Sequence, residues 1–114
     1  MLMEFARGDS YERGFILKNK KTGQPITTAY DDVFFTVKKY YTESEVKLQK
    51  KLSDGGITYD GDGHYTVIIR PEDTDSLAFG EYDFDIEFAK GGTYRRTFVG
   101  KLKLLKEVTF RSNE

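Results

Sequence analysis

Strict alternation of apolar and acidic side chains between Glu81 and Phe88 is the feature that most constrains the fold of this chain. Two sets of residues occupy alternate positions there: Tyr82, Phe84, Ile86 and Phe88 against Asp83, Asp85 and Glu87. Successive side chains of a β-strand point to opposite faces. The segment therefore predicts a strand with one face in a core and the other in water.

The same period of two recurs along the chain. Alternation or short apolar runs predict further strands at residues 11–17, 33–37, 46–52, 65–69, 97–104 and 108–110. The runs at 33–37 and 65–69 are partly apolar on both faces, which indicates central strands. Turns rich in glycine and polar residues separate the runs at 19–23, 53–56, 60–63 and 90–92. We therefore predict an all-β fold: an immunoglobulin-like antiparallel β-sandwich of about seven strands.

One short helical turn is expected near residues 71–77, which begin with Pro71 and carry acids directly after it. We interpret this turn as a crossover between the two sheets. The chain has 114 residues, close to the commonest domain size, and no stretch suited to a linker. Residues 1–114 are accordingly predicted to form a single sandwich domain.

Composition narrows the classes of function. Nine Phe and eight Tyr supply an aromatic core. The formal net charge is only −1, whereas nucleic-acid binders usually carry a net positive charge. The chain has no cysteine, so it can form neither a disulfide nor a thiolate metal site. No apolar run approaches the ~20 residues that span a bilayer, and the first residues do not resemble a secretion signal. We expect no nucleic acid, no membrane and no cofactor as a partner.

The hairpin between the two last long strands can be predicted to its register. A three-residue loop, Lys90-Gly91-Gly92, would pair Phe84 with Phe98 and Glu87 with Arg95. A two-residue Gly91-Gly92 turn would set apolar residues opposite polar ones. Because a slip of one residue exchanges the faces, the pattern favours the three-residue loop with a bulge at Gly92.

Two resemblances follow from longer strings. Pro71-Glu72-Asp73-Thr74 and then Gly80-Glu81-Tyr82-Asp83-Phe84 resemble the connection into strand F of immunoglobulin variable domains. The resemblance implies that the Tyr82 hydroxyl hydrogen-bonds back across the corner. Phe84 stands at the position of the disulfide cysteine, and the absence of Cys and Trp separates the chain from antibodies.

Over nearly its full length the chain resembles small tail-associated proteins of bacteriophages and prophages, above all the N-terminal immunoglobulin-like domain of phage baseplate upper proteins. The strings that carry this resemblance lie at residues 7–11, 33–39, 69–74, 82–87 and 107–110. It implies a structural subunit of a baseplate, neck or tail that is made in the bacterial host cytoplasm and ends in the virion. Its partners would be other tail or baseplate subunits and copies of itself, with no reaction attached.

Several candidate sites have simpler explanations. Asp60-Gly61-Asp62-Gly63 resembles part of a calcium loop, but its twelfth position is Pro71 where an EF-hand has Glu, so we predict a hairpin turn. Arg7-Gly8-Asp9 matches the integrin-recognition tripeptide, yet Gly8 is better explained by a turn. His64 is the only histidine and is expected to point outward. We predict no metal site and no catalytic residue.

The acids of the 81–88 strand share one face, as the carboxylates of a glycosidase would. Cross-strand pairing with Arg95 and Lys101 explains them without catalysis. The best candidates for a binding site are Tyr40, Tyr41 and Tyr59, because tyrosines near loops make good protein contacts. Two hypotheses follow: a non-catalytic assembly protein, or a carbohydrate-binding module whose tyrosines stack on sugar rings.

Overall fold

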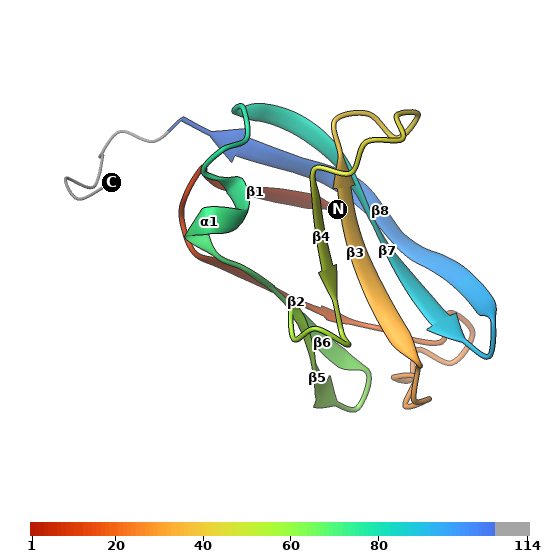
Figure 1. Cartoon of the computed structure of the whole chain (residues 1–114). Helices are drawn as coiled ribbons and strands as arrows, with labels where there is room; N and C mark the ends of the chain where they lie inside the picture. Colours follow the sequence, from red (N-terminus) through yellow and green to blue (C-terminus); the bar gives the residue numbers. More distant parts are fainter. Residues whose placement is uncertain (107–114) are drawn as a thin grey trace.

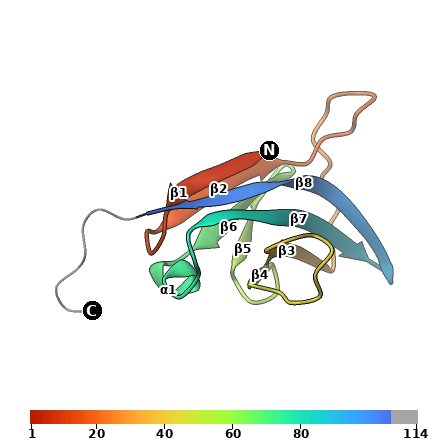
Figure 2. The ribbon, with the colours of Figure 1, turned by 90° about the horizontal axis from the view of Figure 1, so that it is seen from above.

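Two β-sheets pack face to face in the computed structural model, which describes residues 1–106 (Figure 1). The first sheet has five strands in the order β1-β8-β7-β3-β4, and the second has three in the order β2-β6-β5. The strands are β1 (Leu2–Ala6), β2 (Tyr11–Ile16), β3 (Asp32–Lys38), β4 (Leu48–Lys51), β5 (Ile57–Gly61), β6 (His64–Ile69), β7 (Gly80–Lys90) and β8 (Thr93–Leu105). The view from above shows β7 and β8 as long neighbouring strands (Figure 2). The predicted all-β sandwich is confirmed.

The expected strands are present with shifted ends, and two were not predicted. β1 and β5 bring the number of strands among residues 1–106 to eight, and the segment predicted at 108–110 lies outside the described residues. β3 and β6 are central, as their two-sided apolar pattern indicated. β1 pairs with β8 in parallel, whereas every other strand pair in the described part is antiparallel. An antiparallel sandwich is therefore correct except at this edge.

The core lies between the sheets and consists of the alternate side chains of each strand. On β7, the residues Tyr82, Phe84, Ile86 and Phe88 are each at most 3% exposed. Facing them are residues of the second sheet, such as Tyr65, whose ring lies 5.4 Å from that of Phe88. The prediction that the apolar face of β7 enters the core is confirmed.

A single helical turn, α1 (Pro71–Thr74), connects β6 of one sheet with β7 of the other, as predicted. Thr74 is fully buried and its hydroxyl accepts a hydrogen bond of 2.9 Å from the Gly8 amide. Gly8 has a φ of 83°, so a turn does explain this glycine. Further on, the Tyr82 hydroxyl donates to the Ala78 carbonyl, which is the corner that the immunoglobulin resemblance implied.

The predicted register of the β7–β8 hairpin is wrong. Lys90 pairs with Thr93, so the turn has two residues, Gly91 and Gly92, with φ of 58° and 82°. Positive φ at both central residues is what a tight type I′ hairpin turn requires. The bulge lies further along, where the register shifts between Ile86 and Glu87 and leaves Thr97 without a partner. This extra residue restores the faces that a two-residue turn would otherwise exchange.

The relocated bulge also changes the cross-strand neighbours. Phe84 lies opposite Gly100 and not opposite Phe98, which pairs with Ile86. Glu87 pairs with Arg96, whereas Arg95 pairs with Phe88. Arg96 therefore takes the position that was predicted for Arg95.

The hairpin turn expected at residues 60–63 is confirmed between β5 and β6. Gly61, Asp62 and Gly63 all have positive φ, and the register shifts between Tyr59 and Gly61. His64, the residue after this turn, is exposed as predicted.

Candidate binding groove on the five-stranded sheet

Charges of opposite sign alternate from strand to strand on the outer face of the five-stranded sheet. β7 contributes a row of four acids: Glu81, Asp83, Asp85 and Glu87. β8 places basic residues beside them, since Lys103 pairs with Glu81, Lys101 with Asp83 and Arg96 with Glu87 in the register. On the other side of the row, Lys38 of β3 pairs with Asp83. Opposite charges on neighbouring strands stabilise a sheet, so this face is internally matched.

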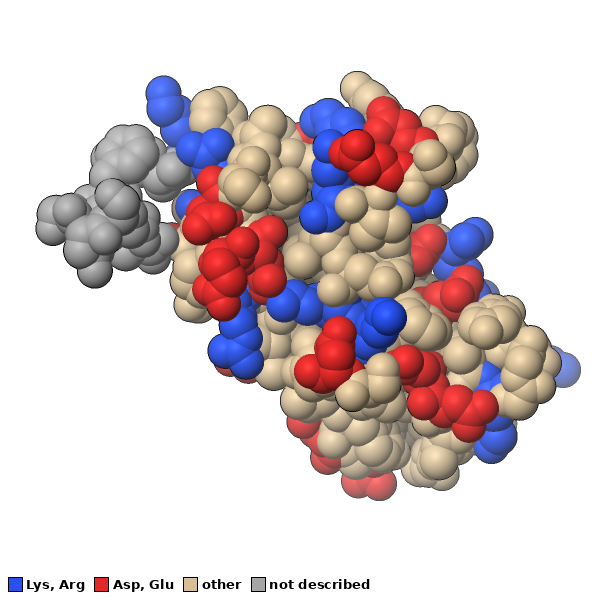
Figure 3. Space-filling view, in the orientation of Figure 1, with Lys and Arg blue, Asp and Glu red and all other residues tan. Residues whose placement is uncertain are grey.

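The matching extends beyond this sheet. Figure 3 shows basic and acidic residues interspersed over one face of the molecule. Near α1, the Lys50 ammonium pairs with the Asp73 carboxylate, and both side chains are largely buried. The described surface in this view therefore mixes the two signs.

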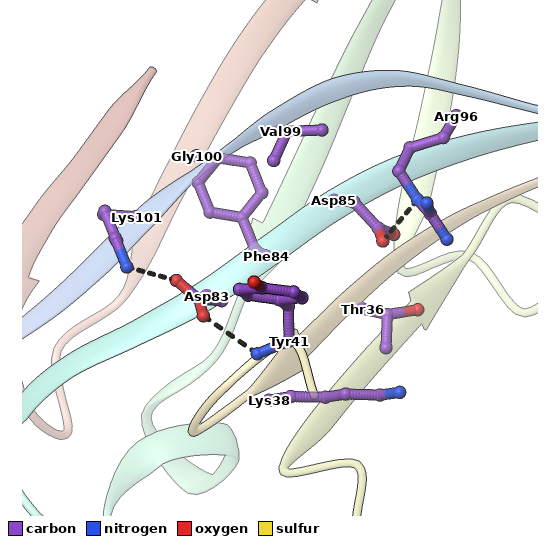
Figure 4. Close-up of a pocket in the computed structure, with 10 residues that line it drawn as sticks. All are labelled: Thr36, Lys38, Tyr41, Asp83, Phe84, Asp85, Arg96, Val99, Gly100 and Lys101. Atoms are coloured by element: carbon purple, nitrogen blue, oxygen red, sulfur yellow. Dashed lines mark hydrogen bonds and ion pairs between the residues drawn. The ribbon is translucent and has the colours of Figure 1, made fainter. Parts of the chain in front are cut away.

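A groove of about 430 Å³ crosses this outer face over β3, β7 and β8 (Figure 4). Its lining consists of Thr36, Lys38, Tyr41, Asp83, Phe84, Asp85, Arg96, Val99, Gly100 and Lys101. Two of these side chains are large, apolar or aromatic, and strongly exposed: Tyr41 is 81% exposed and Val99 is 65% exposed. The groove thus combines an apolar centre with a charged surround.

Asp83 holds Tyr41 in place at one side of the groove. One carboxylate oxygen of Asp83 accepts a hydrogen bond of 2.9 Å from the Tyr41 amide, and the other accepts from the Lys101 ammonium (Figure 4). The hydrogen bond from Lys101, helped by that from Tyr41, holds the pKa of Asp83 below its ordinary value, against the opposing effect of burial. The same pair raises the pKa of Lys101. Asp83 therefore links the loop after β3 to β8 as an acceptor that is ionised at neutral pH.

A second ion pair lies further along the groove. The Arg96 guanidinium contacts the Asp85 carboxylate at 2.8 Å, with the Arg96 side chain 59% exposed. The bulge at Thr97 moves Arg96 into the register of β7, so that it reaches the acidic row. Val99 lies on β8 between Arg96 and Lys101, and therefore between the Arg96–Asp85 and Lys101–Asp83 ion pairs.

The structure separates the three tyrosines that were predicted as contact residues. Tyr41 lines the groove. Tyr40 is 57% exposed in the same loop but lies outside that lining, with its ring 5.9 Å from the Lys39 ammonium. Tyr59 belongs to β5 of the other sheet, where its ring lies 4.8 Å from that of Tyr65. One tyrosine, not three, belongs to this groove, and its contact role stays a prediction.

Two residues of the groove escaped the sequence-based interpretation. Val99 occupies a position of β8 where the alternation of that strand calls for a polar residue, and this mismatch was the available signal. Arg96 carried no such signal, because its place depends on the bulge. Lys101 was predicted to pair with the acids of β7, and its pairing with Asp83 confirms this.

The described residues give no sign of a metal site or of a membrane-spanning helix. Among residues 1–106, no three His, Cys, Asp or Glu side chains gather in a way that could hold a metal ion. No helix in the part of the chain that the structure describes is long and apolar enough to cross a membrane.

Comparison with known proteins gives a likeness of fold. No protein-family model matches the chain, and no curated protein matches it significantly. An X-ray structure of the endo-beta-1,4-mannanase from Thermotoga petrophila is similar, with a TM-score of 0.57 and 16% sequence identity. The likeness covers 92% of this chain but 18% of the enzyme. This chain therefore shares a fold with one part of a much longer protein.

Proposed function

We propose that this protein is a non-catalytic structural subunit of a bacteriophage or prophage tail, and that the groove on the five-stranded sheet contacts a neighbouring subunit. The observation that carries the proposal is Tyr41, which is 81% exposed and yet fixed to the sheet through its backbone bond to Asp83. Because this bond fixes the backbone that presents the ring, less conformational entropy of the loop is lost on binding. Such anchors, with an apolar neighbour and a charged surround, are typical of the centres of protein interfaces.

The chemistry of the groove supports binding over catalysis. General acid catalysis at neutral pH needs a carboxyl with a raised pKa. Asp83 has the opposite shift, since its pKa is lowered by the Lys101 ammonium and the Tyr41 amide. Asp85 is engaged by Arg96. Both carboxylates therefore serve as acceptors within the protein's own ion pairs.

The assignment to a tail rests on the sequence resemblance to the N-terminal domain of baseplate upper proteins. In this proposal the protein is made in the host cytoplasm, binds other tail or baseplate subunits or copies of itself, and ends in the virion. Many copies in one particle would make weak contacts effective, because a second contact within an assembly forms at high effective concentration.

Mass spectrometry of purified particles tests the virion assignment. We expect a fixed ratio of this protein to the major tail protein in particles from the host that carries its gene. Particles in which the protein is absent would refute the assignment.

Two tyrosine variants test the groove. Tyr41→Ala should lower the amount of protein incorporated into particles at least fivefold. The matched control Tyr40→Ala removes an exposed ring from the same loop but outside the groove, and it should be incorporated normally. Equal incorporation of Tyr41→Ala and the wild type would exclude the groove as the contact.

A carbohydrate-binding module is the second candidate. It is favoured by the fold shared with part of a mannanase and by a groove in which one exposed ring lies among carboxylate, guanidinium and ammonium groups. Isothermal titration calorimetry with β-1,4-linked manno-oligosaccharides tests it. Binding in the millimolar range or tighter that Tyr41→Ala abolishes would favour this candidate, and no heat with the wild type would favour the assembly role.

A further inference from the structure

A second hollow lies at the end of the sandwich where the loop between β2 and β3 approaches the β7–β8 hairpin. In Figure 1 these are the orange loop and the blue hairpin at the lower right. The hollow measures about 430 Å³, and five cationic residues are among those that line it: Lys18, Lys20, Lys21, Arg95 and Arg96. They come from segments more than 70 positions apart in the sequence, so the fold brings them together.

Four of the five cations of this hollow have no acidic partner among residues 1–106. Its lining contains no carboxylate. Lys18, Lys20, Lys21 and Arg95 make no ion pair within residues 1–106, in contrast to the lysines of the sheet face and of α1. Only Arg96, at the border with the groove, has an acidic partner, Asp85. Five cations thus gather in a chain whose formal net charge is −1.

The loop that presents the lysines has a defined hydrogen-bonded structure. The Asn19 side-chain oxygen accepts hydrogen bonds from the Lys21 amide at 2.9 Å and the Thr22 amide at 3.2 Å. The Asn19 carbonyl accepts a further bond of 2.8 Å from the Gly23 amide. The bases of the lysine side chains are therefore fixed while their ammonium groups reach into solvent.

The two arginines of the hollow come from β8, between the hairpin turn and the bulge. A regular strand sends neighbouring side chains to opposite faces, and residues that pair directly across two strands share a face. Here Arg95, Arg96 and Thr97 are consecutive and all line the hollow. Arg95 pairs with the core residue Phe88, whereas Arg96 pairs with Glu87 of the outer face and contacts Asp85 there. Arg95 therefore belongs to the hollow alone, and Arg96 is shared with the groove.

We propose that this hollow binds a flexible linear polymer of phosphate-type anions. Like-charged side chains that repel one another gain most from a multivalent anion, which neutralises several at once. The volume exceeds by an order of magnitude the ~30 Å³ of one water molecule, which is room for more than one anionic group. Both kinds of cation in the lining suit phosphate oxygens, because lysine binds them as a compact point charge and arginine can bind them with two parallel hydrogen bonds.

Nucleic acid fits the hollow less well than a phosphate polymer without bases. Proteins that bind single strands offer exposed aromatic rings on which bases stack. The one aromatic residue in the lining is Tyr30, which is half-buried with its ring 4.9 Å from that of Phe88. The hollow thus offers charge without an exposed stacking surface. This inference is independent of the proposed role of the groove.

Fluorescence anisotropy with labelled inorganic polyphosphate tests the proposal on the whole chain. We expect wild-type binding whose affinity falls with added salt, and at least tenfold weaker binding for the double variant Lys20→Gln/Lys21→Gln. Arg95→Gln should act in the same direction. These side chains are exposed, so thermal unfolding of the variants should match the wild type.

The matched control is Lys51→Gln/Lys103→Gln, which removes the same charge from the sheet face, outside the hollow. It should bind polyphosphate within threefold of the wild type, and Tyr41→Ala should do the same. Equal weakening by the control pair would overturn the proposal, because it would show attraction by charge in general. Equal or tighter binding of poly-glutamate or of single-stranded DNA would overturn the assignment to a phosphate polymer.

Discussion

Gly100→Ala should destabilise this protein through one steric conflict. Gly100 lies on β8 opposite Phe84, and a Cβ atom added there would stand 2.2 Å from the Met1 carbonyl oxygen. The same Cβ would lie 3.0 Å from the Phe84 ring. Gly100 has no positive φ, so the conflict comes from packing and not from its own backbone angles. The Met1 oxygen is also the acceptor of the Lys101 amide, at 3.0 Å.

The size of the effect follows from what must move. Ordinary contact begins near 3.4 Å, so the start of β1 has to retreat by more than 1 Å or release its bond to Lys101. Overpacking of this kind costs about 1–3 kcal/mol. Met3 is fully buried, and burial of a whole side chain of this size is worth about 1.5–3 kcal/mol. If β1 moves away from β8, part of this free energy is lost as well. Against this, alanine is favoured over glycine in a strand by about 0.5–1 kcal/mol. We expect a net loss of about 2 kcal/mol.

Gly14→Ala is the matched control. Gly14 lies on β2, also without positive φ, and an added Cβ would meet nothing closer than the Tyr65 carbonyl oxygen at 3.8 Å. It should be neutral or stabilising by up to about 1 kcal/mol. Urea unfolding of both variants gives the free energies, and Tm should fall by roughly 8 °C in Gly100→Ala alone. Hydrogen exchange of the Lys101 amide should also become faster in that variant. Unfolding free energies that agree within about 0.5 kcal/mol would refute the steric argument.

Three further perturbations follow from the same contacts. Tyr82→Phe leaves the Ala78 carbonyl without its donor and should cost about 1–2 kcal/mol by urea unfolding; an unchanged midpoint would contradict a role for the corner. Because the pKa of Asp83 is lowered in the folded protein, its stabilising effect is present above its ordinary pKa of 3.8 and is lost as pH falls through the folded value. The stability advantage of the wild type over Asp83→Asn should therefore shrink below about pH 4, and a constant difference from pH 7 to pH 2 would refute this. Burial raises the pKa of Tyr65 from 10.0 to about 12, so the unfolded chain loses this proton first and stability falls between those values. Tyr65→Phe should show a smaller decrease over that range in thermal unfolding, and an equal decrease would count against the shift.

Hydrophobic periodicity predicted which face of each strand is buried better than it predicted which residues pair across strands. The alternation from Tyr82 to Phe88 identified which side chains of β7 enter the core, because the period of a strand depends on local geometry alone. The position of the bulge depends on how two strands fit over their whole length. For that reason the two-residue turn and the placement of Arg96 were missed. The pair Gly91-Gly92, which permits a two-residue turn, was a better guide to the hairpin than the matching of apolar faces across the two strands.

The two unpredicted strands are missed for a different reason. Leu2 is exposed while Met3 and Phe5 are buried, so the apolar residues of β1 do not alternate cleanly with polar ones. β5 has one fully buried residue, Ile57, and runs directly into a turn. Both lie at sheet edges, where little of a strand's surface is enclosed and the sequence pattern is correspondingly weak.

The candidate site was predictable in part. The acids of β7 and their pairing with Lys101 follow from strand alternation and charge. The contact between Tyr41 and Asp83 joins residues 42 positions apart and depends on the path of an irregular loop. No periodicity describes such a path, and so Tyr41 could not be distinguished from Tyr40 and Tyr59 before the structure.

The parallel edge strand has a practical consequence for anyone who attaches something to this protein. Met1 bonds to Lys101 and lies against Gly100, and both of these residues line the groove. Any tag, linker or fused domain placed before Met1 would emerge beside the groove, where it would compete with whatever docks there. On the proposal that the groove is a contact surface, immobilisation through the amino end should weaken the measured affinity, and attachment through the three-stranded sheet should not.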